Sequence, residues 1–125
     1  MTKGKPEENT PSKEKVFKDS IFREFSTVED PRNPSKITHQ LSNVLFMTIC
    51  AILCGANNLK EIAAYAKRRE PWFTSLLSLS NGVPSYVTFW WILALLDSEQ
   101  VQQSFVKWVQ SICKRQINPS FFFFL

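Results

Sequence analysis

Glycine, histidine and cysteine are scarce in this chain of 125 residues, and each shortage excludes a class of protein. Three glycines leave few flexible turns, which disfavours a sheet protein and favours packed helices. The sole histidine, His39, and the absence of a CxxC pair argue against a metal site. A glycine-rich phosphate loop and a GxSxG motif are also missing, which excludes most nucleotide and nucleophilic chemistry. We therefore expect no metal, no cofactor, no catalytic residue and no small-molecule substrate.

The three cysteines are Cys50, Cys54 and Cys113, and the first two lie one helical turn apart in an apolar run. An odd number in this arrangement argues against a disulfide framework and favours buried free thiols in a reducing compartment. The N-terminal residues are polar, with no apolar stretch behind them, which argues against a signal peptide. The sequence therefore predicts a cytoplasmic protein.

Long apolar runs are missing as well. The uncharged stretch 44–56 has about 13 residues, whereas a membrane-spanning helix needs roughly 20. The second apolar stretch, residues 86–96, is shorter still. Both stretches favour core helices over membrane spans. We expect residues 41–54 to be buried in a bundle, packed against helices that carry Phe25, Ile62, Leu95 and Phe105.

Helical periodicity extends through most of the chain. Apolar residues recur at helical spacing over residues 14–28, whereas residues 38–54 are apolar nearly all round, which is typical of a central buried helix. Further helices are expected after Asn58, from Pro71, after Ser85 and from Asp97 or Ser98. No segment alternates as a strand does. The sequence predicts an all-α fold, a compact bundle of five or six helices with a helix-turn-helix-like C-terminal half.

The two ends of the chain differ from this helical domain. Residues 1–13 are polar and show no periodicity, so we expect a disordered tail. Residues 14–116 form the expected helical domain. Residues 117–125 include four adjacent phenylalanines, which match no amphipathic register and suggest an aberrant Phe-rich end.

The positive charge is concentrated in the middle of the chain. Residues 31–96 contain six basic and two acidic residues, a surplus equal to the whole net charge of +4. A solvated basic face is the commoner meaning of such a surplus, although it also admits nucleic acid or an anionic membrane as a partner. We expect weak DNA binding and no membrane association; the oligomeric state is not indicated.

The order of helix, short helical piece, Asn-Gly turn and second helix over residues 58–96 is similar to a helix-turn-helix. A plain helical hairpin explains the same pattern. Trp90 and Trp91 also place bulky apolar groups where a groove-reading helix needs polar or basic ones. The best DNA-contact candidates are the basic cluster and the polar residues that start the second helix: Lys67, Arg68, Arg69, Ser85, Tyr86 and Thr88.

Five blocks of residues, in order and suitably spaced, carry a resemblance to a known family. The blocks are Phe25-x-x-Val28-x-Asp30-Pro31-Arg32; His39 with the run Leu45-x-x-x-Ile49-x-Ala51-x-Leu53-Cys54-Gly55-Ala56; Ile62-Ala63-x-Tyr65-Ala66; Leu79-x-Asn81-Gly82-Val83-Pro84-Ser85-x-x-Thr88-Phe89; and Ala94-Leu95-Leu96-Asp97 with Phe105-x-x-Trp108. Over roughly residues 17–112 the chain resembles the DDE transposase-associated N-terminal domain of the H-repeat-associated family of bacterial insertion-sequence transposases.

The resemblance implies a helical N-terminal domain followed by a catalytic domain whose three carboxylates hold two divalent metals for strand cleavage and transfer. In the family that second domain opens with an Asp-Gly-Lys motif, and no such motif occurs before Leu125. No catalytic residue can therefore be carried over. We expect a non-catalytic fragment, truncated before the catalytic domain, that acts in DNA transposition.

The chain also departs from the family pattern. Relatives usually have polar or basic residues near positions 86, 87, 90 and 91, where this chain has Tyr86, Val87, Trp90 and Trp91. If those positions contact DNA in relatives, this chain should bind DNA poorly. The alternative interpretation is a small membrane-associated or protein-interaction module that uses this aromatic surface.

Overall fold

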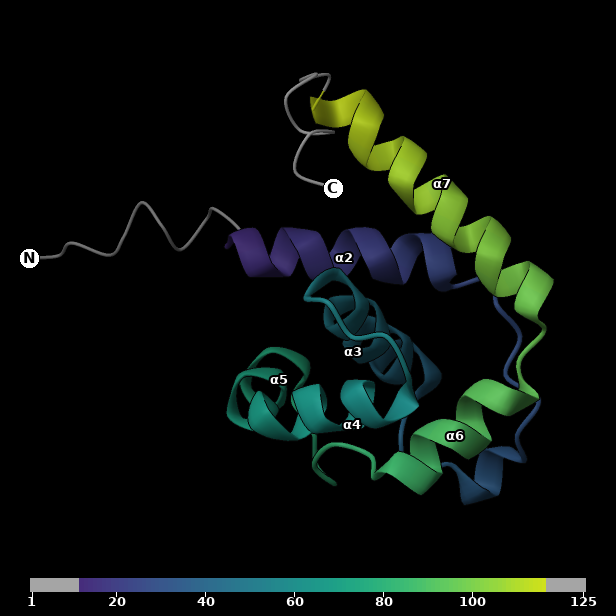
Figure 1. The fold of residues 1–125 in the computed structure, drawn as a ribbon. Helices are drawn as coiled ribbons and strands as arrows, with labels where there is room; N and C mark the ends of the chain where they lie inside the picture. The colour runs from purple at the N-terminus through teal and green to yellow at the C-terminus, as the bar shows by residue number, and fades with distance from the viewer. Residues whose placement is uncertain (1–11, 117–125) are drawn as a thin grey trace, which may run out of the picture.

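The computed structural model describes residues 12–116, and all regular structure in that range is helical (Figure 1). Within these residues six α-helices follow one another, with one 3-10 turn, η1, between the first two: α2 (Lys13–Phe25), η1 (Pro34–Lys36), α3 (Leu41–Leu53), α4 (Leu59–Arg68), α5 (Glu70–Leu77), α6 (Tyr86–Leu95) and α7 (Ser98–Gln116). The prediction of an all-α fold with five or six helices is confirmed.

The predicted ends of the chain lie mostly outside the described residues. Residues 1–11 of the expected disordered tail and all of the Phe-rich end, 117–125, are among those not described. Lys13, which falls in the predicted tail, instead begins α2, and Ser12 is the N-cap of this helix. The Ser12 side chain accepts the backbone N–H of Lys15 at 3.1 Å and so caps the helix.

Short polar side chains begin the helices where the sequence indicates. The Asn58 side chain accepts the N–H of Glu61 at 2.9 Å, and the Asp97 carboxylate accepts the N–H of Glu99 at 2.9 Å. Each cap satisfies a backbone donor that the first turn of a helix leaves without an intrahelical partner.

Two predicted boundaries were wrong by a few residues. The first helix ends at Phe25 and not at 28, and the second begins at Leu41 and not at 38.

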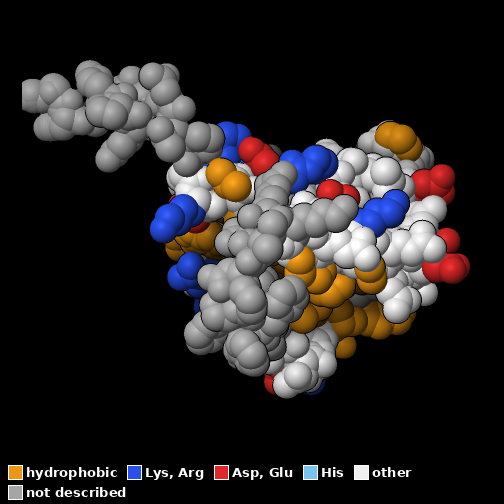
Figure 2. All heavy atoms as spheres, turned by 90° about the horizontal axis from the view of Figure 1, so that it is seen from above, with side chains coloured by type: hydrophobic (Ala, Val, Ile, Leu, Met, Phe, Trp, Pro, Cys, Tyr) orange, Lys and Arg blue, Asp and Glu red, His pale blue; other side chains and the backbone are white. Residues whose placement is uncertain are grey.

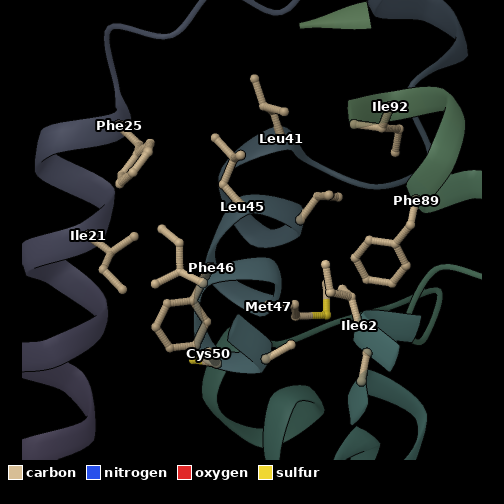
Figure 3. Packing of buried hydrophobic residues seen from close by; sticks show 14 of the residues in the cluster. Ile21, Phe25, Leu41, Leu45, Phe46, Met47, Cys50, Ile62, Phe89 and Ile92 are labelled. Atoms are coloured by element: carbon tan, nitrogen blue, oxygen red, sulfur yellow. The ribbon is translucent and has the colours of Figure 1, made fainter. Parts of the chain in front are cut away.

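The core is built around α3. Val44, Phe46, Met47 and Ala51 of this helix are fully buried. Figure 3 shows how neighbouring helices enclose them: Ile21 and Phe25 of α2 approach from one side, and Ile62 of α4 with Phe89 and Ile92 of α6 from the other. Burial of this apolar surface is the main contribution to the stability of the bundle.

One part of the core prediction was wrong. Ile52 and Leu53, in the last turn of α3, are 51% and 48% exposed, and neither Leu95 nor Phe105 is buried. The reason is geometric, because α6 directs Phe89 and Ile92 toward the core, and Leu95 lies on its outer side. The C-terminal turn of α3 therefore remains partly uncovered within the described chain.

The two outermost helices of the described chain, α2 and α7, pack against each other (Figure 1). The indole N–H of Trp108 donates to the Ser20 hydroxyl at 2.9 Å, and that hydroxyl donates to the Phe17 carbonyl at 2.7 Å. Both Ser20 and Trp108 are buried, so each polar group needs this partner.

Among the described residues, no helix combines the length and the apolar character that crossing a membrane requires.

Replacement of Ile49 and Leu53 should separate buried from exposed positions on the same helix. Ile49→Ala should lower the free energy of unfolding by about 2–5 kcal/mol, because a 6% exposed side chain leaves a cavity. Leu53→Ala should cost about 1 kcal/mol or less, because about half of this side chain is already in water. Urea unfolding followed by circular dichroism measures both, and equal losses would contradict the exposure of Leu53.

Ser20→Ala should destabilise the chain by about 1–3 kcal/mol, because it leaves the buried Trp108 N–H without an acceptor. Ser26→Ala is the matched control, since this hydroxyl also bonds a carbonyl three residues earlier, that of Arg23, but is exposed. The control should change the free energy of unfolding by about 0.5 kcal/mol or less. Thermal unfolding in which the two variants behave alike would show that the Trp108 contact contributes little.

Candidate nucleic-acid interface

The basic cluster lies at the C-terminal end of α4. Ile62 and Ala66 fix the helix against the core, and Lys67, Arg68 and Arg69 follow on the solvent side, all three exposed. A neighbouring aromatic ring holds each guanidinium group: Arg68 lies 6.0 Å from the ring centroid of Tyr65, and Arg69 lies 5.0 Å from that of Trp72. Cations at this end of a helix also interact favourably with its dipole, which is a purely structural reason for them.

The carboxylate of Glu70 connects this cluster to the loop before α6. One oxygen lies 3.2 Å from Lys67 Nζ, and the other accepts the backbone N–H of Val83 at 3.1 Å. These contacts hold the pKa of Glu70 below its usual value, mainly through the Val83 hydrogen bond and then through Lys67. Because Val83 is two residues before Ser85, the link relates the basic end of α4 to the start of α6.

Gly82 makes this link sterically feasible. Its φ of +70° lies in the left-handed region, and a Cβ at this position would stand 2.7 Å from Glu70 Oε2. On the other side of the loop, the Asn81 side-chain amide donates to the Thr38 carbonyl at 3.3 Å. The sequence analysis identified the Asn-Gly turn but missed Glu70. The need for a residue without a side chain at 82 was the only signal of a close partner.

The three polar candidates at the start of α6 are placed next to this loop. The Ser85 hydroxyl accepts the Thr88 N–H at 3.3 Å and donates to the Thr88 hydroxyl at 3.1 Å, so the predicted cap is confirmed. These contacts occupy much of the hydrogen-bonding capacity of the two hydroxyls. Tyr86 is 41% exposed.

The rest of the exposed surface of α6 is apolar. Val87, Trp90, Trp91 and Leu95 are each between 44% and 57% exposed, and the rings of Trp90 and Trp91 meet edge to face at 4.9 Å. The helix contains no charged residue. Bidentate reading of base edges needs Arg, Lys, Asn, Gln or a carboxylate, so α6 offers no such contact. The alternative interpretation, a membrane-associated or protein-interaction module, rests on this exposed apolar surface alone, and no other finding supports it.

The surroundings of Asp30 and His39 shift the pKa values of both side chains. Asp30 forms an ion pair with Arg32 at 2.7 Å, and hydrogen bonding from that guanidinium lowers the pKa of Asp30. Desolvation lowers the pKa of His39, with Arg32 as a second cause. Residues 12–116 contain no cluster of three His, Cys, Asp or Glu side chains that could hold a metal ion.

All three cysteines are free thiols, as expected, but only Cys50 is fully buried. Cys50 is buried, and burial raises the pKa of its thiol to about 12, which makes it a poor nucleophile. Cys54 is exposed, contrary to prediction, because it lies beyond the last turn of α3, with its sulfur 3.5 Å from the Tyr65 hydroxyl. Burial and this contact raise the pKa of Tyr65 to about 12.

Several known proteins are similar to this chain in sequence. A Xanthobacter autotrophicus protein named "Uncharacterized protein in dhlA 3'region" is 35% identical over 86 residues, which cover 67% of this chain and 29% of that protein. "Putative transposase YncI" of Escherichia coli O157:H7 is 31% identical over 91 residues, 73% of this chain and 23% of its own length. "H repeat-associated putative transposase YbfD" of Escherichia coli K12 is 25% identical over 89 residues, 71% of this chain and 35% of its own length.

This chain therefore spans roughly a quarter to a third of the length of these relatives. No solved structure shows a significant match to it. The model of the DDE_Tnp_1-associated family matches residues 22–109, a range that begins in α2 and ends in α7. This match and the names of the relatives confirm the resemblance that the sequence blocks carry. The chain belongs to the DDE_Tnp_1-associated family.

Proposed function

We propose that this chain is a non-catalytic helical region of a transposase and that it contacts DNA phosphates in DNA transposition. The observation that carries the proposal is the exposed basic end of α4, Lys67, Arg68 and Arg69, in a member of a transposase-associated family. Cations on a rigid helix end attract the phosphate backbone and require no base-specific geometry.

The proposed contact surface extends from the basic end of α4 to the start of α6. The Glu70 carboxylate fixes the loop between the two by accepting the Val83 N–H. Ser85, Tyr86 and Thr88 then follow as polar groups that can reach phosphate oxygens at the N-terminus of α6, where the helix dipole favours negative charge. The ion pair between Glu70 and Lys67 reduces the net positive charge of this surface, so the two arginines supply most of its attraction for phosphate.

Phosphate contact without base readout implies weak, sequence-tolerant binding. The exposed side chains of α6 beyond Tyr86 are apolar, so they add no hydrogen bonds to base edges. Backbone contacts position a protein on duplex DNA, whereas base contacts select the sequence. We therefore expect these contacts to bind the DNA backbone without selecting a base sequence.

Salt dependence tests the proposal. Three phosphate contacts should give a slope of about −2.7 in a plot of log binding constant against log salt concentration. A variant with Lys67, Arg68 and Arg69 changed to Ala should lose most of that slope in fluorescence anisotropy with a labelled duplex.

The matched control changes Lys13, Lys15 and Lys18 of α2 to Ala, which removes the same formal charge elsewhere. This control should retain the slope. An equal loss in both variants would mean that net charge alone drives binding, and no detectable binding at low salt would leave only the structural role of the basic cluster. Circular dichroism should confirm that both variants remain helical.

The purified chain should not cleave or join DNA strands with magnesium or manganese. The described residues bring no three acidic side chains together, and two-metal strand chemistry depends on such a set. Conversion of supercoiled plasmid to nicked or linear forms is the measurement. Metal-dependent cleavage that disappears when an acidic residue of this chain is changed to its amide would refute the non-catalytic assignment.

A further inference from the structure

The Glu70 carboxylate lies among groups that favour an anion. One of its oxygens is 3.2 Å from the Lys67 ammonium group, and the other accepts the backbone N–H of Val83 at 3.1 Å. The backbone of Gly82 comes so close to the second oxygen that a Cβ would stand 2.7 Å from it. Backbone N–H groups in turns of this kind form anion-binding concavities in many proteins, and a cation beside them strengthens the effect.

This contact differs from the other ion pairs of residues 12–116. Two of the other three pairs join side chains alone, and in the third the carboxylate also accepts the N–H of its own partner, Arg32. On the face seen in Figure 2, basic and acidic side chains are likewise interspersed, as simple pairing between side chains requires. Glu70 accepts an N–H from a loop thirteen residues away. Neutralising a lysine requires no backbone donor, so the loop itself is part of the anion-binding arrangement.

The turn that supplies this N–H is also held from its other side. The Asn81 side chain donates to the Thr38 carbonyl at 3.3 Å, Pro84 is buried, and Val83 packs against the core. None of these contacts involves Glu70, so the Val83 N–H should keep its direction when the carboxylate leaves. A preorganised donor binds an anion without the cost of ordering a loop.

The carboxylate is held weakly enough to be exchanged for another anion. The Lys67 and Glu70 side chains are 76% and 29% exposed, and water and salt screen an ion pair of this kind. A phosphate oxygen accepts hydrogen bonds from the same donors as a carboxylate oxygen. Arg68 and Arg69 directly precede Glu70, and the phosphates that they attract would have a raised local concentration at this position.

We infer that Lys67 and the Gly82–Val83 turn form a binding site for a phosphate group, and that Glu70 occupies this site in the free chain. A bound phosphate takes the positions of the two carboxylate oxygens, and the Glu70 side chain turns into the surrounding water. The phosphate belongs to the DNA backbone, an assignment of its source that rests on the proposed function. Glu70 then lowers the affinity of the chain for DNA, because the phosphate must displace it.

Titration of the isotope-labelled full chain with inorganic phosphate, followed by nuclear magnetic resonance at constant ionic strength, tests the site. In Glu70→Ala the Val83 amide signal should shift in a saturable way, because phosphate replaces the missing carboxylate. The unaltered chain should need at least about tenfold more phosphate, because its tethered carboxylate competes at an effective concentration in the mM range. No saturable shift of Val83 in Glu70→Ala, or an equal phosphate requirement in both chains, would overturn the proposal.

Glu61→Ala is the matched control. Like Glu70, Glu61 lies in the first turn of a helix, and its carboxylate accepts a backbone N–H, that of Asn57 at 2.6 Å. This variant loses the same charge and the same kind of hydrogen bond, but at Val83 it should need as much phosphate as the unaltered chain. A reduction as large as that in Glu70→Ala would mean that net charge governs phosphate binding, which contradicts a local site.

Glu70→Gln separates the charge from the support of the loop. Its amide oxygen can still accept the Val83 N–H, so the loop should keep its structure even if Glu70→Ala disturbs it. A neutral amide is a weaker competitor than a carboxylate for donors that favour an anion. Glu70→Gln should therefore need less phosphate than the unaltered chain, with unchanged helicity in circular dichroism. An unchanged phosphate requirement in this variant would count against Glu70 as the occupant.

A labelled DNA duplex identifies the source of the phosphate. Glu70→Gln should bind the duplex about fivefold more tightly at low salt, the effect of removing one unit charge about 4 Å from a phosphate in water. If Val83 responds to inorganic phosphate but this variant binds DNA no more tightly, the DNA assignment is refuted. If Val83 responds and no chain binds the duplex, the proposed function fails and the phosphate site stands.

Discussion

Burial of α3 is the constraint on which the rest of the structure depends. The helix has no charged residue, and nine of its thirteen residues are buried. Water must therefore be excluded from several sides of this helix. Three other helices do this, and each contributes two apolar side chains. The pairs are Ile21 and Phe25 of α2, Ile62 and Ala66 of α4, and Phe89 and Ile92 of α6. Because α2 and α4 are amphipathic, their charged residues are directed outward by the same requirement.

The sequence was most informative where structure is decided locally. Asn58, Ser85 and Asp97 begin helices as expected, because a cap depends on residues only two or three positions away. It was least informative about coverage. An apolar residue such as Leu53 looks the same in sequence whether or not another helix reaches it, and here none covers it fully. The Glu70 contact to Val83 spans thirteen residues and leaves no periodic signal; Gly82 hints at a close partner, and the structure identifies that partner as Glu70.

The candidate site could likewise be predicted only in its local part. A basic run is visible in sequence, but its surroundings are not. The structure adds two aromatic rings that hold Arg68 and Arg69, and one carboxylate that ties Lys67 to the next loop. It also shows that α6 uses Phe89 and Ile92 for the core and leaves its tryptophans exposed. Positive charge and aromatic surface therefore belong to different helices, and a single partner need not use both.

The packing of α2 against α7 has a consequence for how the protein folds during synthesis. Ser20 and Trp108 are separated by 88 residues, so α2 is made long before the helix that completes its contacts. At roughly 5–20 residues per second, about 4 to 18 s pass between the two. Until then the α7-facing side of α2 has no partner and is open to chaperones or to other nascent chains. Among the helices that the structure describes, α7 is made last, and it completes the packing of α2.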